Sequence, residues 1–98
     1  MKRYYSEYIA HCLTFYTRYP DLSHFRSETD RENWQACHNI VSSLPEDERV
    51  IVVAVYKPAD TVRSNVSNAA KNMRMSRETV WKIINEVERR VAEQRGLI

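Results

Sequence analysis

The sequence contains little glycine and no long apolar run. Gly96 is the single glycine in 98 residues, which argues against a sandwich or barrel of β-strands, because hairpins use glycine repeatedly. Glycine-rich phosphate loops and dinucleotide fingerprints are excluded as well, since they need closely spaced glycines. The longest apolar run, 50–56, is much shorter than the ~20 residues that cross a bilayer. No secretion signal is recognisable. We therefore expect one cytoplasmic domain over residues 1–98, with no membrane partner.

Cysteine is also scarce, and no group of residues indicates a metal site or an active site. Cys12 and Cys37 are too few for a disulfide framework, and a reducing cytosol keeps them as thiols. Each has a neighbouring histidine, His11 or His38, so a zinc site can be imagined. Adjacent helical residues point about 100° apart, however, and both cysteines fall on apolar stripes, which favours core packing. We expect no metal, no cofactor and no enzymatic activity.

Charge distinguishes the C-terminal part of the chain from the rest. Residues 60–98 carry eight basic and five acidic side chains, although the net charge of the whole chain is only +2. The stretch 62–77 has basic residues and no acid; the basic residues are Arg63, Lys71, Arg74 and Arg77. A basic stretch with interspersed serine and asparagine suits a phosphate backbone. A solvated basic surface without a ligand is the alternative.

Apolar spacings of three and four predict two amphipathic helices in the N-terminal half. The first runs from about Lys2 to Tyr19, and Pro20 ends it. Its predicted stripe consists of Tyr5, Tyr8, Ile9, Cys12, Phe15, Tyr16 and Tyr19. Ser27 or Thr29 caps the second helix, whose first turn holds the acids that a helix N-terminus favours. The stripe of the second helix consists of Trp34, Cys37, Val41 and Leu44.

The apolar run 50–56 fits two kinds of secondary structure. Its β-branched residues favour a strand, but no partner strand is visible elsewhere in the sequence. Pro45 at a first helical position, followed by three acids, is typical of a helix start. We predict a buried helix that ends before Pro58, with a strand as the alternative.

Two further helices, joined by a tight turn, complete the predicted fold. Asp60 or Thr61 caps the fourth helix, and Ser76 caps the last, which ends near Arg95 before Gly96. The predicted apolar positions are Val62, Val66, Ala69, Ala70 and Met73 in the fourth helix, and Val80, Ile83, Ile84, Val87 and Val91 in the last. The predicted fold class is all-α, with about five helices. A helical region (1–43) precedes a C-terminal helix-turn-helix (44–98).

The window 66–85 meets several spacing requirements of a helix-turn-helix. Ala70 is small at the place where the two helices cross, methionines flank the turn, and Val80 and Ile83 face the preceding helix. Arg74 occupies the turn, where a left-handed backbone is expected and costs a non-glycine residue about 1 kcal/mol. We expect a DNA-binding helix-turn-helix; a helical hairpin that packs only for its own stability is the alternative.

The outward face of the last helix carries polar side chains of mixed type. Lysine and arginine can read guanine, asparagine can read adenine, and glutamate can accept from cytosine. The expected base-reading residues are Arg77, Glu78, Trp81, Lys82 and Asn85. The expected phosphate contacts are Arg63, Lys71, Arg74, Ser76 and Arg89. A solvated face is the alternative, because Glu78–Lys82 and Glu86–Arg90 have the spacing of helical ion pairs.

The segment 44–49 (Leu-Pro-Glu-Asp-Glu-Arg), the apolar helix and the helix-turn-helix together resemble region four of bacterial sigma factors. That family commonly opens with a Leu-Pro-acid-Arg segment, and its last helix often begins Thr/Ser-Arg-Glu, as at 76–78. The resemblance covers about residues 43–95. The chain departs from the family in a connector about four residues longer before Ala70, in Arg74 at the turn, and in Trp81, where the family commonly has arginine. Trp81 argues against the promoter sequence that the family reads.

A tyrosine-rich helix ending at Tyr19–Pro20, followed by a sigma-like helix-turn-helix, is similar to the RinA/ArpU-type regulators of phage late genes. That resemblance implies a phage or mobile-element transcription regulator, with RNA polymerase as a further partner. We expect a sequence-specific regulator that reads the major groove of double-stranded DNA with the helix 76–95. Aromatic side chains in excess of one stripe suggest a homodimer through the N-terminal helices. The alternative is a protein-interaction adaptor, or a sigma-like factor bound to polymerase that does not read DNA on its own.

Overall fold

The computed structural model describes residues 4–98, and every regular element within them is an α-helix. In chain order the helices are α1 (Ser6–Arg18), α2 (Glu28–Ser42), α3 (Glu46–Tyr56), α4 (Val62–Met73) and α5 (Arg77–Gln94). The predictions of an all-α fold with five helices, and of a helix over the run 50–56, are therefore confirmed. The expected start of the first helix at Lys2 lies outside the described residues. Tyr4 and Tyr5 form a turn, so α1 begins at Ser6.

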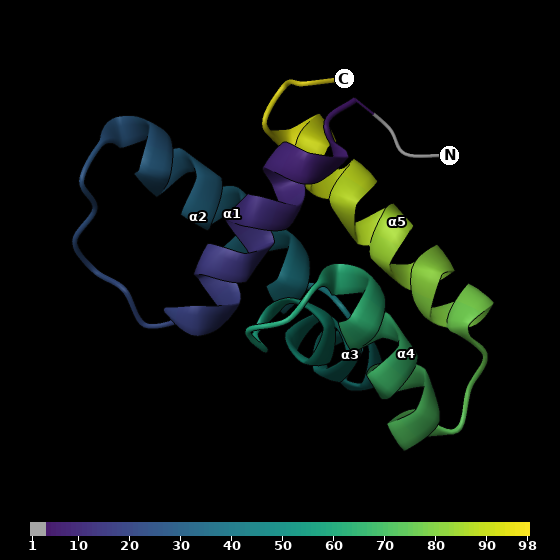
Figure 1. Ribbon diagram of the computed structural model, residues 1–98. Coiled ribbons are helices and arrows are strands. Elements are labelled where there is room, and N and C mark those ends of the chain that lie inside the picture. The colour runs from purple at the N-terminus through teal and green to yellow at the C-terminus, as the bar shows by residue number, and fades with distance from the viewer. Residues whose placement is uncertain (1–3) are drawn as a thin grey trace.

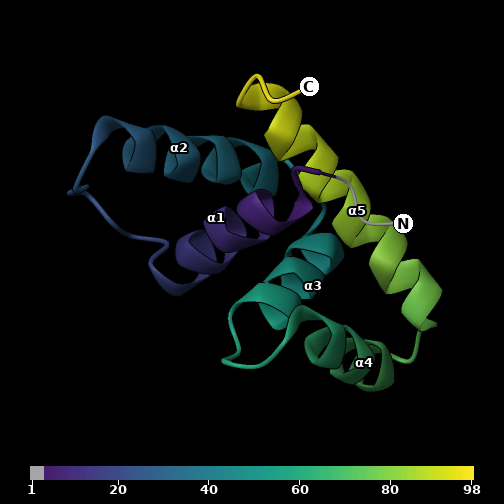
Figure 2. The same ribbon diagram turned by 45° about the horizontal axis from the view of Figure 1, so that its top comes forward.

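The helices form two groups that share α3 and α5. Figures 1 and 2 show α1 beside α2, and α4 beside α3, while α5 runs along both groups toward the C-terminus. Among the described residues, α3 and α5 each contact the four other helices, whereas α4 contacts only these two. The radius of gyration is 12.8 Å, close to the ~13 Å expected for a folded chain of about 100 residues.

The core draws side chains from all five helices. The largest fully buried ones are Tyr56, Ile9, Leu13, Ile51, Ile84, Val52, Val55, Val66, Val80, Val87, Val91 and Cys37. The predicted stripe of α1 is partly wrong. Tyr8, Phe15 and Tyr19 are 43%, 37% and 53% exposed, while Leu13, which the stripe omitted, is fully buried. The reason is that α1 packs against α2, α3 and α5 at once, which centres its buried arc on Ile9 and Leu13.

Side-chain caps fix where three helices begin. The hydroxyls of Ser27, Thr61 and Ser76 each accept a hydrogen bond at 3.1 Å from the backbone N–H three residues ahead. They thereby satisfy one of the unpaired donors of α2, α4 and α5. Pro45 precedes α3 instead of occupying its first position, because its ψ of 154° is extended. The acids that follow Pro45 therefore fill the first turn, where the helix dipole stabilises them.

A buried carboxylate connects α1, α3 and α5. Glu88 of α5 is 4% exposed and accepts hydrogen bonds from the hydroxyls of Ser6 and Tyr56, both at 2.5 Å. Burial and the negative charge of Glu88 raise the pKa of Tyr56 well above its ordinary value, so the phenol remains a donor. Ser6 is the first residue of α1, whose preceding residue makes no side-chain capping bond. The carboxylate thus lies at the end of α1 where the dipole is positive.

A buried amide connects α4 to the end of α3 and to the connector that follows it. The side-chain Nδ2 of Asn65, a residue 3% exposed, lies 2.8 Å from the carbonyl oxygen of Val55. The same nitrogen lies 3.4 and 3.5 Å from the carbonyls of Pro58 and Asp60. Arg18 of α1 donates to the same connector, with its Nη2 3.5 Å from the carbonyl of Pro58. Asn65 therefore satisfies a carbonyl in the last turn of α3, which has no helical partner.

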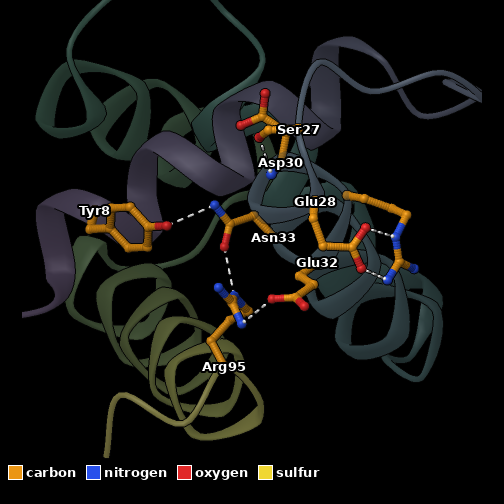
Figure 3. A network of polar contacts seen from close by, with 8 residues as sticks. Tyr8, Ser27, Glu28, Asp30, Glu32, Asn33 and Arg95 are labelled. Atoms are coloured by element: carbon orange, nitrogen blue, oxygen red, sulfur yellow. Dashed lines mark hydrogen bonds and ion pairs between the residues drawn. The ribbon is translucent and has the colours of Figure 1, made fainter.

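The end of α5 is bound to α2 by a polar network (Figure 3). Arg95 donates from Nε to Oδ1 of Asn33 at 2.6 Å and forms an ion pair of 3.2 Å with Glu32. The amide of Asn33 in turn donates to the hydroxyl of Tyr8 at 2.8 Å. Gly96 follows with φ 74°, as expected of a glycine that ends a helix. The network ties the C-terminal end of α5 to the N-terminal helices.

Candidate nucleic-acid interface

The turn between α4 and α5 contains the left-handed residue that the sequence predicts. Arg74 has φ 55° and ψ 45° and is the one non-glycine residue with positive φ among residues 4–98. Its N–H lies 3.4 Å from the carbonyl of Lys71, and the N–H of Met75 donates to the carbonyl of Ala70 at 3.0 Å. This pair of bonds is a Schellman motif, which ends a helix and reverses the chain. The predicted tight turn is therefore confirmed.

Small and β-branched side chains allow α4 and α5 to pack together. Ala70 is 4% exposed, and Val66 and Val80 are fully buried, as the helix-turn-helix spacing predicts. Ile83 was predicted to face α4, but it is only partly buried and lines an open groove. The reason is that the buried arc of α5 is centred on Val80, Ile84, Val87 and Val91, so Ile83 falls at its edge.

We expect Arg74→Gly to raise the free energy of unfolding by about 0.5–1 kcal/mol, because glycine adopts positive φ without the steric penalty of a Cβ. Urea unfolding followed by circular dichroism measures the change. Arg77→Gly is the matched control: Arg77 is exposed in the first turn of α5, where glycine lowers stability. A loss of stability in Arg74→Gly would contradict the strain assigned to the turn.

The predicted base-reading residues lie on the outer side of α5 and at its start. Arg77, Glu78, Lys82 and Asn85 are exposed, and Trp81 is half-buried with part of its ring against the core. Glu78, Lys82 and Asn85 share the face opposite the buried arc, because they are spaced by about one helical turn. The fold therefore brings these three together, with Trp81 on the flank of the face.

The basic residues at the front of α5 and those at its rear differ in their partners. Within residues 4–98, Arg77 and Lys82 form no ion pair, so the spacing of Lys82 from Glu78 is not used for one. Arg89 donates to both carboxylate oxygens of Glu86 at 3.0 and 2.6 Å and lies 3.6 Å from Glu93. Glu86 and Glu93 also raise the pKa of Arg89.

The expected phosphate contacts therefore fall into two groups. Arg63, Lys71 and Arg74 are exposed on α4 and its turn, and none of them forms an ion pair within the described part of the chain. Ser76 and Arg89 are already engaged, Ser76 with the backbone N–H of Thr79 in the cap, and Arg89 with acids of its own helix. Only the first group presents uncompensated positive charge.

An open groove of about 590 Å³ runs along one flank of α5. It is lined by Leu44, Glu48, Lys82, Ile83, Asn85, Glu86, Val87 and Arg90. Beside it, Arg90 donates to the hydroxyl of Ser43 at 3.1 Å. The spacing of Arg90 from Glu86 fits a helical ion pair and gives no sign of this groove, since residues 43–48 approach α5 only through the fold. Lys82 and Asn85 lie at the border between this groove and the outer face.

The cysteines pack in the core, as the sequence predicts. Cys12 is 7% exposed and Cys37 is fully buried. Burial raises the pKa of the Cys12 thiol to about 11 and that of Cys37 further, so both are protonated at neutral pH.

Within residues 4–98, His, Cys, Asp and Glu side chains form no group of three that could hold a metal ion. In the same part of the chain no helix combines the length and the apolar character that crossing a membrane requires.

Comparisons of the chain with protein families, with curated proteins and with solved structures found no match.

Proposed function

We propose that the chain is a sequence-specific DNA-binding transcription regulator that places the first turns of α5 in the major groove. The observation that carries the proposal is the turn at Arg74, whose left-handed backbone and Schellman bonds join α4 and α5 as a helix-turn-helix requires. Uncompensated basic side chains lie on both sides of that turn. In such motifs the N-terminal residues of the second helix contact base edges, while the preceding helix contacts the backbone.

The charges along α5 indicate how far the helix enters the groove. Its 18 residues span about 27 Å, which is longer than a recognition helix needs. Up to Asn85 the exposed side chains include Arg77 in the first turn and Lys82 on the outer face, neither of which forms an ion pair within residues 4–98, and a single acid, Glu78. Beyond Asn85, Glu86 and Glu93 surround Arg89. These two acids compensate Arg89, so the rear of the helix offers less free positive charge to phosphates; we therefore assign base reading to residues 77–85 and a helix-stabilising role to Arg89.

The resemblance to region four of sigma factors and to RinA/ArpU-type regulators supports the same proposal. It adds RNA polymerase as a partner and the cytoplasm of a bacterium, under phage or mobile-element control, as the setting. Trp81 lies on the flank of the reading face, where its indole can contact a thymine methyl or sugar. The operator therefore differs from the sequence that an arginine would select at that place.

The proposal is tested by selecting bound sequences from a random pool of duplex DNA. The affinity of each variant for the most strongly selected sequence is then measured. We expect Lys82→Ala and Asn85→Ala to lose about 1–3 kcal/mol each on the selected sequence, or roughly 5–150-fold in affinity, and little on unrelated DNA. Arg63→Ala and Lys71→Ala should weaken binding to all sequences alike and reduce the salt slope by about one each.

Arg26→Ala is the matched control, because Arg26 has a side chain 95% exposed in the connector between α1 and α2. It should bind as the original protein does. Identical behaviour of the Lys82 and Arg63 variants would contradict the division into base-reading and phosphate-contacting residues. Absence of any salt-dependent binding to duplex DNA would refute the proposed function.

A protein-interaction adaptor is the second candidate, and exposed rings on α1 and at its two ends favour it. Tyr4, Tyr8, Phe15 and Tyr19 remain exposed, whereas Tyr5 and Tyr16 are buried and cannot serve the N-terminal homodimer that the sequence suggested. An adaptor, or a polymerase-bound factor that does not read DNA, would bind its protein partner. In the selection from random duplex DNA it would enrich no sequence.

A further inference from the structure

The solvent face of α3 carries an apolar stripe that nothing in residues 4–98 covers. Val50 and Val53 are 50% and 40% exposed, and within residues 4–98 no other aliphatic side chain inside a helix is among the exposed large hydrophobic ones. Glu46 and Lys57, both exposed, continue the stripe at either end. The intervals of four, three and four residues are those of a coiled-coil seam.

The opposite face of α3 accounts for its contacts within the chain. Ile51, Val52, Val55 and Tyr56 are buried there, and α1 and α4 lie on either side of the helix (Figure 2). The exposed side has instead a shallow hollow of about 470 Å³, lined by Glu46, Arg49, Val50, Val53 and Ala54. Val50 and Val53 therefore do not contribute to the core of a single copy.

We infer that two copies of the chain associate through this stripe, with their α3 helices antiparallel about a twofold axis. When Val50 of one copy faces Val53 of the other, the same register places Glu46 opposite Lys57 at both ends. Arg49 then falls opposite Ala54, whose small side chain leaves room. A parallel pair would instead bring Glu46 against Glu46 and Lys57 against Lys57. Charge complementarity thus favours a second copy of α3 as the partner of this stripe, and it favours the antiparallel over the parallel orientation.

The small contact area of α3 implies that the association is weak. The 11 residues of α3 span about 16 Å, so one such helix covers much less than the ~800 Å² per partner of a standard interface. We expect a dissociation constant on the order of 0.1–1 mM for the free protein. On DNA, two adjacent half-sites would add to this contact; that step rests on the proposed function, and the association itself does not.

The exposed rings on α1 and at its two ends are a less suitable surface for a second copy. The hydroxyl of Tyr8 accepts a hydrogen bond from Asn33 at 2.8 Å, and the rings of Phe15 and Tyr19 pack on each other at 5.3 Å. The hydroxyl of Tyr4 donates to the carbonyl of Leu97. Each of these rings thus has a contact with its own chain, whereas no side chain of residues 4–98 covers Val50 and Val53.

Sedimentation of the full chain without DNA, up to about 2 mM, tests the inference. The original protein should associate, and Val50→Ser should remove the association. Phe15→Ser is the matched control and should leave it unchanged. Glu46→Lys and Lys57→Glu should each be monomeric, since each creates like-charge contacts at both ends of the seam. An equimolar mixture of these two variants should form a heterodimer, because every end contact in it is again oppositely charged.

Circular dichroism of each variant at the same concentration establishes that it is folded, which is necessary because the lysine of Glu46→Lys opposes the dipole at the start of α3. A monomeric original protein at about 2 mM, or a mixture that stays monomeric, overturns the inference. Association that survives Val50→Ser and is lost in Phe15→Ser assigns the contact to α1 instead. No DNA is present, so these outcomes are independent of the test of DNA binding.

Discussion

Asn65→Asp should lower the free energy of unfolding by about 3 kcal/mol at pH 7, the cost of a buried polar group that has lost its donor and gained a charge. The Asn65 amide donates to the Val55 carbonyl at 2.8 Å and faces two further carbonyls. A carboxylate cannot donate, so the substitution leaves that carbonyl unpaired and places a negative charge among oxygen atoms. The dipole of α4, whose N-terminus is one turn away, offsets only part of this.

The effect of Asn65→Asp should depend on pH in a defined direction. Burial and the facing carbonyls disfavour the charged form, so the pKa of the new carboxyl is higher in the folded than in the unfolded chain. The variant is then most stable below the unfolded pKa of ~3.9 and loses stability as the pH rises through the folded pKa. Urea unfolding at several pH values measures this. Asn68→Asp, the same change at an exposed position of α4, should show neither the loss nor the pH dependence.

Glu88→Ala should lower the free energy of unfolding by about 3 kcal/mol, because it leaves the buried hydroxyl of Tyr56 without an acceptor and opens a space between three helices. Part of the loss is offset, since a buried carboxylate no longer has to be desolvated. For a domain of this size such a change lowers the melting temperature by more than about 10 °C. Thermal unfolding measures it, with Glu78→Ala on the exposed face of the same helix as the control.

A double-mutant cycle with Tyr56→Phe isolates the hydrogen bond between Tyr56 and Glu88. Tyr56→Phe alone should cost about 1–3 kcal/mol, and the double variant should lose less than the sum of the two single changes. Strict additivity would mean that the two groups contribute independently, contrary to the 2.5 Å contact between them.

Spacing and capping patterns carried most of the fold prediction. The five helices, the serine and threonine caps and the left-handed turn at Arg74 follow from local rules that act within one or two helical turns. Pro45 and its acids resolved the run 50–56 in favour of a helix, because a dipole-stabilised first turn is a local signal. The partly wrong stripe of α1 has the opposite origin: Leu13 is buried only because three other helices surround α1.

The polar residues of the core were not predicted, although the position of one of them, Glu88, in the sequence was informative. Glu88 lies one turn after Ile84 and beside Val87, within the apolar arc, where an acid needs a partner. That partner, Tyr56, is 32 residues away, and no local rule identifies it. The exposure of Lys82 and Asn85 could be predicted from periodicity, and that of Arg77 from its place in the first turn of α5. The engagement of Arg89 by Glu86 could not, because several i to i+3 and i to i+4 pairs compete on α5.

The peripheral position of α4 affects how such a chain can diverge. Because α4 contacts only α3 and α5 among the helices of residues 4–98, a change in its length disturbs two helix interfaces. A comparable change in α3 or α5 disturbs four. Changes of length among descendants of this sequence should therefore be tolerated better in α4 than in α3 or α5, provided that the connector 57–61 keeps the carbonyls that Arg18 and Asn65 contact. The outer residues of α4 and α5 can then drift toward new partners while the core stays the same.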